Sequence, residues 1–161
     1  VIDSVENEVE DAYFAHLRFA SGAVGTVFGG VAGHGEPLAL PQMPAIYGTK
    51  GCIKGGEIIL DDGFRAQGNV LFDGSVAPEL MERWFPWGLK DGFALEWLDF
   101  LRSIENDDTM ETDGEEGLRD LACSYSILES STLNRPVRVA DVLSGEVAVY
   151  QRSINEYYGL S

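Results

Sequence analysis

The apolar residues of this chain change their period once, and that change constrains the fold more than any other feature. Between residues 11 and 32 apolar side chains alternate with others, which is typical of β-strands with two different faces. From residue 93 onward they recur at helical spacing, which is typical of amphipathic helices. Strands followed by helices predict an α+β fold: an open, mostly antiparallel β-sheet with helices packed on one face. The other face is then available for contact with a subunit or a domain.

The first two strands are expected to form a hairpin around Ser21-Gly22. Small residues of this kind favour a tight loop between two alternating runs. If the loop has two residues, His16 lies opposite Val27. The side chains on each face of the hairpin follow from that register, because successive residues of a strand point to opposite faces.

In this register the two faces of the hairpin differ in chemistry. The face expected to pack against helices carries Tyr13, Ala15, Leu17, Phe19, Val24, Thr26 and Phe28. The opposite face carries Phe14, His16, Arg18, Gly25, Val27, Gly29 and Val31. Because that second face mixes a ring, an imidazole and a guanidinium with glycines, it is less typical of a sealed core. We therefore expect Phe14, His16 and Arg18 to lie at an interface.

The remaining pattern predicts several shorter elements. Apolar runs between turn residues predict strands over 45–47, 52–53, 57–60 and 69–72. Amphipathic runs predict helices over 93–106, 113–133 and 145–158, with a short extended piece at 137–139. Asp113 is a good N-cap, and Glu116 completes a pair similar to a capping box. Asn134 and Pro136 are expected to end the second of these helices.

Charge and cysteine content exclude several classes of partner. The chain holds 27 acidic and 11 basic residues, for a formal net charge of −16. Nucleic acids and anionic membranes need clustered basic residues, so neither is expected as a partner. Cys52 and Cys123 lack metal-ligand spacing, so no metal site is expected. Two distant cysteines indicate small buried thiols in a reduced, cytoplasmic protein.

Two segments are candidates for ligand contact. His34 lies in the loop Gly33-His34-Gly35, where a contact with a ligand is plausible because functional residues favour loops. Arg83, Trp84 and Trp87 lie in the segment 83–87, whose rings and guanidinium suit a sugar or an anion. The same segment also suits a loop that its tryptophans anchor on the core, and the sequence leaves both readings open.

No catalytic residue and no cofactor site emerge from the pattern. The glycines between residues 22 and 35 do not form GxGxxG, and no helical period follows them, so a dinucleotide site is not expected there. Glu96 and Asp99 are within one helical turn of each other, but nothing in the sequence indicates that they act as an acid/base pair. They are expected to be solvated or capping carboxylates.

Five segments in order resemble the Gfo/Idh/MocA oxidoreductase family. Residues 9–25 resemble its hairpin "VEDxxxxxLxFxxGxxG", and residues 46–51 resemble its turn "IxGTxG". Residues 93–104 resemble the helix "FxxExxxFxxAI", and residues 112–118 resemble the helix start "TxGxDGLxAL". Residues 129–137 resemble the ending "ESAxxGRxV". Together they cover roughly residues 9 to 142 in the order of the family, which makes the resemblance specific.

The resemblance implies a fold and a role. The family joins an amino-terminal Rossmann domain, which binds NAD or NADP, to a carboxy-terminal α+β domain that builds the substrate pocket and pairs between subunits. By this resemblance residues 1–161 form a single α+β domain without the Rossmann domain and without a cofactor of their own. They would provide the substrate-binding and oligomerisation domain of an NAD(P)-dependent oxidoreductase, a homo-oligomer acting on a sugar, inositol or related polyol.

The sequence departs from the family where the chemistry is performed. The Lys of the family's "EKP" motif and the His of its "DxGxH" segment have no counterparts here. No catalytic residue is therefore carried over, and the isolated chain is expected to be inactive. A stand-alone, non-catalytic binding or assembly module that uses the open sheet face is the alternative.

Overall fold

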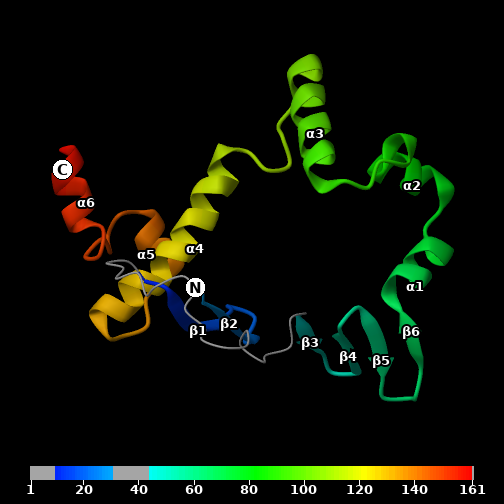
Figure 1. The fold of residues 1–161 in the computed structure, drawn as a ribbon, viewed down its shortest axis with the longest axis horizontal. Helices are drawn as coiled ribbons and strands as arrows, with labels where there is room; N and C mark the ends of the chain where they lie inside the picture. Colours follow the sequence, from blue (N-terminus) through cyan, green and yellow to red (C-terminus); the bar gives the residue numbers. More distant parts are fainter. Residues whose placement is uncertain (1–9, 31–43, 161) are drawn as a thin grey trace, which may run out of the picture. The chain divides into compact units, whose positions relative to one another are not determined.

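A computed structural model describes residues 10–30 and 44–160. The chain divides into two compact parts, one ending at Trp84 and one beginning at Phe85, and each is described by itself. The first part holds strands β1–β6 with helices α1 and α2, and the second holds the 3₁₀ helix η1 with helices α3–α6 (Figure 1). The α+β class predicted from the sequence is confirmed, whereas the single domain stays a prediction. The described strands form two antiparallel sheets, where one sheet was expected.

The first sheet is the predicted hairpin, but its register differs from the expected one. Strand β1 (Ala12–Arg18) pairs with β2 (Val24–Gly30), and His16 lies opposite Thr26 rather than Val27. The prediction of a two-residue loop was therefore wrong. Phe19 closes the loop by accepting a hydrogen bond from the N–H of Gly22 (2.9 Å) and donating one to Ala23 (3.0 Å). Gly22 has φ 89°, which suits the left-handed position that ends a three-residue hairpin loop.

This extra loop residue changes which side chains share a face. A shift of one residue moves every side chain of one strand to the opposite face of the sheet. Val24, Thr26 and Phe28 therefore lie on the face of Phe14 and His16 and not, as expected, on the face of Tyr13 and Leu17. The rings of Phe14 and Phe28 stack with centroids 5.8 Å apart, and Nδ1 of His16 lies 3.1 Å from Oγ1 of Thr26.

The second sheet is a four-stranded meander in the order β3-β4-β5-β6. Its strands are β3 (Ala45–Tyr47), β4 (Gly51–Lys54), β5 (Glu57–Leu60) and β6 (Arg65–Gln67). The strands expected near 45–47, 52–53 and 57–60 are confirmed.

The strand expected over 69–72 was wrong, because these residues lie in helix α1 (Gly68–Ser75). A short apolar run is compatible with either a strand or a helix, so the pattern alone could not decide. In the helix Phe72 stacks on Trp84 of α2 (Pro78–Trp84), with ring centroids 6.1 Å apart. That aromatic contact joins the two helices of the first part.

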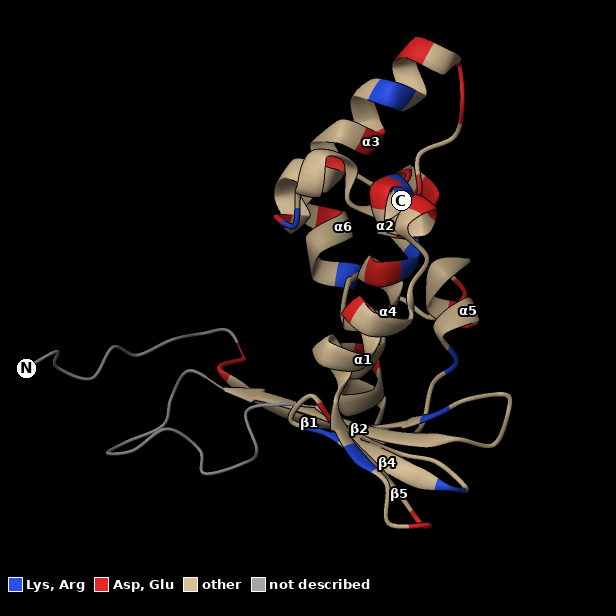
Figure 2. Cartoon of the chain, turned by 90° about the vertical axis from the view of Figure 1, so that its right-hand side faces the viewer, with Lys and Arg blue, Asp and Glu red and all other residues tan. Residues whose placement is uncertain are grey.

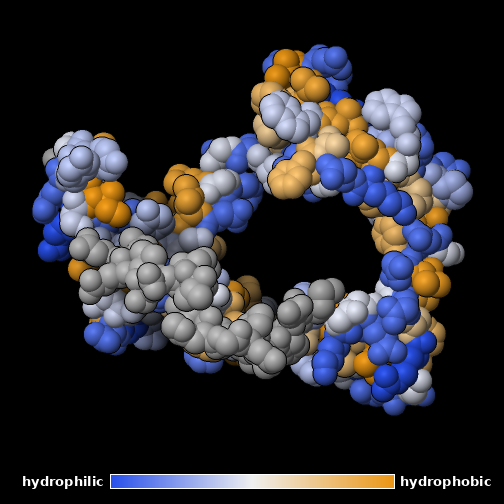
Figure 3. All heavy atoms as spheres, viewed as in Figure 1, coloured by the Kyte–Doolittle hydropathy of each residue, from blue (hydrophilic) through white to orange (hydrophobic). Residues whose placement is uncertain are grey.

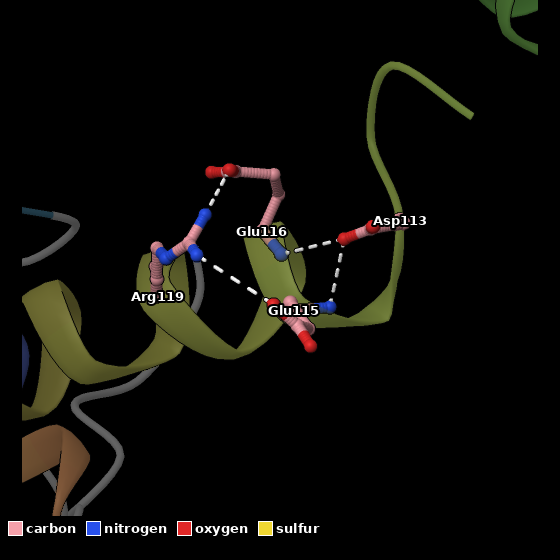
Figure 4. A network of polar contacts seen from close by, with 4 residues as sticks. All are labelled: Asp113, Glu115, Glu116 and Arg119. Carbon is pink, nitrogen blue, oxygen red and sulfur yellow. Dashed lines mark hydrogen bonds and ion pairs between the residues drawn. The ribbon is translucent and has the colours of Figure 1, made fainter. Parts of the chain in front are cut away.

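The second part begins with η1 (Pro86–Gly88) and two helices that the sequence predicted, α3 (Gly92–Asn106) and α4 (Gly114–Leu133). Asp113 is the N-cap of α4, as expected, and accepts hydrogen bonds from the N–H groups of Glu115 (2.9 Å) and Glu116 (3.0 Å; Figure 4). In a complete capping box the side chain of Glu116 would also accept the N–H of Asp113. Here Arg119 instead forms ion pairs with the carboxylates of Glu115 and Glu116. Asn134 ends α4 in the left-handed conformation, with φ 50°.

The carboxy-terminal residues form two short helices instead of the single helix expected over 145–158. Helix α5 (Val139–Leu143) begins within the piece expected to be extended, and α6 (Arg152–Tyr158) begins later than predicted. Gly145, with φ 78°, lies between them in the left-handed region, which ends a helix more readily than it continues one.

A small core holds this end of the chain together. It consists of Ala122, Val142 and Val147, with Tyr125, Leu133 and Val137 packed against it. The carboxylate of Glu129, on the same side of α4, is fully buried and accepts hydrogen bonds from the N–H groups of Val149, Tyr150 and Gln151. Because those residues precede α6, this one side chain fixes the turn between α5 and α6 to α4.

Charged residues, most of them acidic, are more frequent on the helices than on the strands. Most of the strand ribbon carries no charged residue, whereas α3 and α4 carry both signs of charge (Figure 2). Apolar side chains also gather on the surface of α3 (Figure 3); its exposed large apolar residues are Phe93, Trp97, Phe100, Leu101 and Ile104. Among the helices that the structure describes, none has the length and apolar character needed to cross a membrane.

Candidate functional site

The predicted ligand contacts fall in different parts of the chain. His34 lies outside the described residues. Arg83 and Trp84 end α2 in the first part, whereas Trp87 lies in η1 of the second part. Trp84 stacks on Phe72, so this tryptophan is partly anchored, as the alternative reading of the segment expects. The contact role of all four residues stays a prediction.

Trp87 is presented by an unusual backbone conformation. Its φ and ψ are 57° and 20°, the left-handed region that a bulky side chain rarely adopts. Hydrogen bonds hold the turn around it, from the N–H of Gly88 to the oxygen of Phe85 (2.8 Å) and from that of Leu89 to the oxygen of Pro86 (3.1 Å). Pro86 is buried, while Trp87 remains 78% exposed. The turn therefore directs a large aromatic ring outward from an anchored base.

A guanidinium from α3 lies over this ring. The Cζ atom of Arg102 is 5.8 Å from the centroid of Trp87, within the range of a cation–π contact. Lys90 lies similarly over the ring of Phe85, with Nζ at 6.0 Å. Sequence reasoning missed Arg102, because nothing in the helical period of α3 relates it to a tryptophan in a preceding turn.

A shallow depression lies beside α3 in the same part. It has a volume of about 400 Å³ and is lined by Glu96, Trp97, Phe100, Met110 and Thr112. Trp97 and Phe100 meet edge to face, with centroids 5.9 Å apart. A carboxylate and a hydroxyl beside an aromatic wall can hydrogen-bond a polar ring while the aromatic residues cover its apolar face.

Asp99 holds the loop on one side of this depression against α3. Its carboxylate accepts a hydrogen bond from the N–H of Glu111 (2.9 Å). This contact ties the segment that contains Met110 and Thr112 to α3. Glu111 precedes the N-cap of α4, so Asp99 binds a loop N–H and does not cap a helix. Glu96 also lines this depression, a position that sequence reasoning did not predict.

The residues predicted to form an interface share one face of the first hairpin. Phe14, His16 and Arg18 alternate along β1, and the observed register adds Val24 and Thr26 beside them. Phe14 is 67% exposed and Val24 is 80% exposed. We call the face formed by Phe14, His16, Arg18, Val24, Thr26 and Phe28 the hairpin face. It combines rings, an aliphatic side chain and hydrogen-bonding groups, which suits a protein interface.

The described residues do not fit a dinucleotide cofactor. A dinucleotide site needs parallel strands joined by a helix, with a glycine-rich turn at the helix start. Within 10–30 and 44–160 every strand pair is antiparallel, and no helix connects two strands of one sheet. NAD or NADP is therefore not assigned to these residues.

Metal and thiol chemistry are also limited in the described part of the chain. No group of three His, Cys, Asp or Glu residues there could hold a metal ion. Cys52 and Cys123 are both free thiols. Cys52 is half-buried, but Cys123 is exposed, so its expected burial was wrong. The residues of α4 that face the core are Ala122, Ser126 and Glu129, and Cys123 points away from that side.

Comparison with known proteins gives one match. The model of an oxidoreductase family, described as its C-terminal alpha/beta domain, matches residues 3–139. No curated protein and no solved structure matches the chain. The matched residues include both sheets and the first four helices of the structure.

Proposed function

Because this chain belongs to the Gfo/Idh/MocA oxidoreductase family through its C-terminal alpha/beta domain, we propose that it forms the substrate-binding and oligomerisation domain of an NAD(P)-dependent oxidoreductase. The match over residues 3–139 is the observation that carries this proposal. The substrate is a sugar, inositol or related polyol, and the cofactor is held by a Rossmann domain outside these residues. The free thiols of Cys52 and Cys123 agree with a cytoplasmic location.

The proposed substrate contacts are aromatic and cationic side chains. Trp84 and Trp87 are 48% and 78% exposed, so both rings are accessible to the apolar face of a sugar. Arg83 supplies donors to hydroxyl oxygens, and we retain His34 as a further contact. In this role the chain binds and orients the substrate and performs no step of the reaction itself.

The proposed assembly surface is the hairpin face. It exposes apolar side chains, notably Phe14 and Val24, next to the polar groups of His16 and Arg18. Large apolar side chains grouped on an exposed sheet face indicate a contact surface. A second copy of the chain is the proposed partner, so the protein is expected to be a homo-oligomer.

Two measurements on the same preparations test this function. Sedimentation equilibrium should show self-association of the wild-type chain, and Phe14→Asp combined with Val24→Asp should shift it to the monomer. Tyr157→Asp, which places the same charge on an exposed ring of α6, should leave the association unchanged. A wild-type chain that remains monomeric at every concentration would contradict the assembly role.

Titration calorimetry with myo-inositol and with NAD tests the substrate role. The proposal expects the chain to bind inositol and not NAD. Binding of NAD would overturn the division of roles between the two domains. Self-association without any polyol binding would favour the alternative, a non-catalytic assembly module.

A further inference from the structure

The pair formed by Trp87 and Arg102 has features that packing alone does not require. Trp87 has a left-handed backbone conformation and an exposed side chain. Residues held in such sparsely populated conformations cluster at ligand sites, where the surrounding structure enforces them. The buried Pro86 and the two hydrogen bonds around the turn supply that enforcement here. The guanidinium of Arg102 then lies at 5.8 Å from the ring.

The charge of Arg102 is not neutralised by the carboxylates around it. Acidic residues outnumber basic ones by 27 to 11, so most cations could find an acidic partner. Within residues 10–30 and 44–160, however, no ion pair involves Arg102. Asp99, one turn away on α3, instead accepts the N–H of Glu111. That carboxylate satisfies a backbone group, and the guanidinium retains its capacity for an anion.

We propose that Trp87 and Arg102 form a binding site for a sugar that carries an anionic group, either a carboxylate or a phosphate ester. The ring of Trp87 stacks on the apolar face of the sugar, and the guanidinium of Arg102 donates two parallel hydrogen bonds to the anion. A planar guanidinium matches the geometry of both anions. The net charge of the chain is −16, which repels an acidic ligand. A local cation such as Arg102 offsets that repulsion at the site.

This inference rests on the proposed function, because it narrows the substrate class from neutral polyols to acidic sugars. It also adds Arg102 to the substrate contacts. Its test therefore compares acidic and neutral sugars of one ring type: glucuronate, glucose 6-phosphate and glucose. The first two distinguish the carboxylate from the phosphate ester.

Titration calorimetry of the whole chain measures the three affinities. We expect at least one acidic sugar to bind about tenfold or more tightly than glucose, the effect of one charge-assisted contact. Arg102→Gln should abolish this preference. Arg138→Gln, which removes another exposed guanidinium from the second part of the chain, should preserve it. Added salt should weaken the binding of the acidic sugar more than that of glucose.

The ring is tested by Trp87→Gly, which removes the side chain and tolerates the left-handed conformation. This variant should lose binding of the acidic sugar while its circular dichroism spectrum stays that of the wild type. Equal affinity for glucose and both acidic sugars, unchanged in Arg102→Gln, would overturn the inference and leave the proposed function standing. Failure of all three sugars to bind would overturn the inference, whereas the proposed function is tested separately by the titration with myo-inositol.

Discussion

Both carboxylate oxygens of Glu129 accept hydrogen bonds from the backbone N–H of Tyr150, at 3.1 and 3.0 Å. The neighbouring N–H groups of Val149 and Gln151 bond to the same carboxylate at 2.8 and 3.3 Å. A side chain from α4 thus accepts hydrogen bonds from three successive N–H groups immediately before α6. Its complete burial means that water cannot replace it readily.

Glu129→Ala should therefore destabilise the chain strongly. It leaves the part-buried N–H groups of residues 149–151 without their acceptor, which lowers the free energy of unfolding by about 3 kcal/mol. Urea denaturation followed by circular dichroism measures the loss, and amide exchange should show faster exchange at residues 149–151. Glu115→Ala is the matched control, because that side chain is 84% exposed and its ion pair contributes at most about 0.5 kcal/mol. Equal stability of the two variants would contradict the role assigned to Glu129.

Asp113→Ala should shorten α4 from its amino-terminal end. The variant loses the acceptor for the N–H groups of Glu115 and Glu116, and an N-cap of this kind contributes about 1 kcal/mol. Asp113→Ser should retain most of the stability, since its hydroxyl can also cap. Asp120→Ala, an acidic-to-alanine change inside the same helix, should have little effect, and the unfolding midpoints of the three variants check this order.

The hairpin register can be tested by a disulfide. Directly opposite residues of antiparallel strands have Cα atoms about 4.5–5.5 Å apart, close enough for a disulfide. In a background without Cys52 and Cys123, cysteines at His16 and Thr26 should oxidise readily. A two-residue loop would instead place His16 opposite Val27. Cysteines at these two positions should not form a disulfide, because their side chains point to opposite faces. Mass spectrometry after mild oxidation distinguishes the two, and preferential bonding of the second pair would contradict the observed register.

Gly51→Ala should destabilise the second sheet. The backbone of Gly51 has φ 154°, and a Cβ there would overlap the carbonyl oxygen of Ile59 and approach Cα of Leu60 to 2.9 Å. The overlap and the strained conformation together should lower the free energy of unfolding by about 2 kcal/mol or more. Gly117→Ala, at an open position within α4, should instead raise it by up to about 1 kcal/mol. A stabilising Gly51→Ala in the same urea titration would show that the sheet is built differently.

The features that sequence reasoning predicted correctly are those with local causes. The apolar stripe of α3 and the N-cap of α4 at Asp113 both follow from residues within one or two turns. The strands β3 and β5 follow in the same way from their flanking turns. By contrast, α1 was taken for a strand because its apolar run is too short to show a period.

The candidate site was predicted less completely, because its contacts join residues distant in sequence. Trp87 could be named from its aromatic neighbours, but the guanidinium beside it comes from Arg102 on another element. The role of Glu129 likewise depends on the N–H groups of a turn that the sequence placed inside a helix. Such pairings arise from tertiary packing, which no local pattern records.

The turn at Gly22 implies an uneven tolerance to sequence change in the first hairpin. Substitutions at Ala20 or Ser21 would leave the pairing of the strands intact, provided that Gly22 keeps its positive φ. Deletion of either residue would instead produce a two-residue loop. Val24, Thr26 and Phe28 would then lie on the opposite face of the sheet. Among homologous chains, this segment should therefore vary in composition but hardly in length.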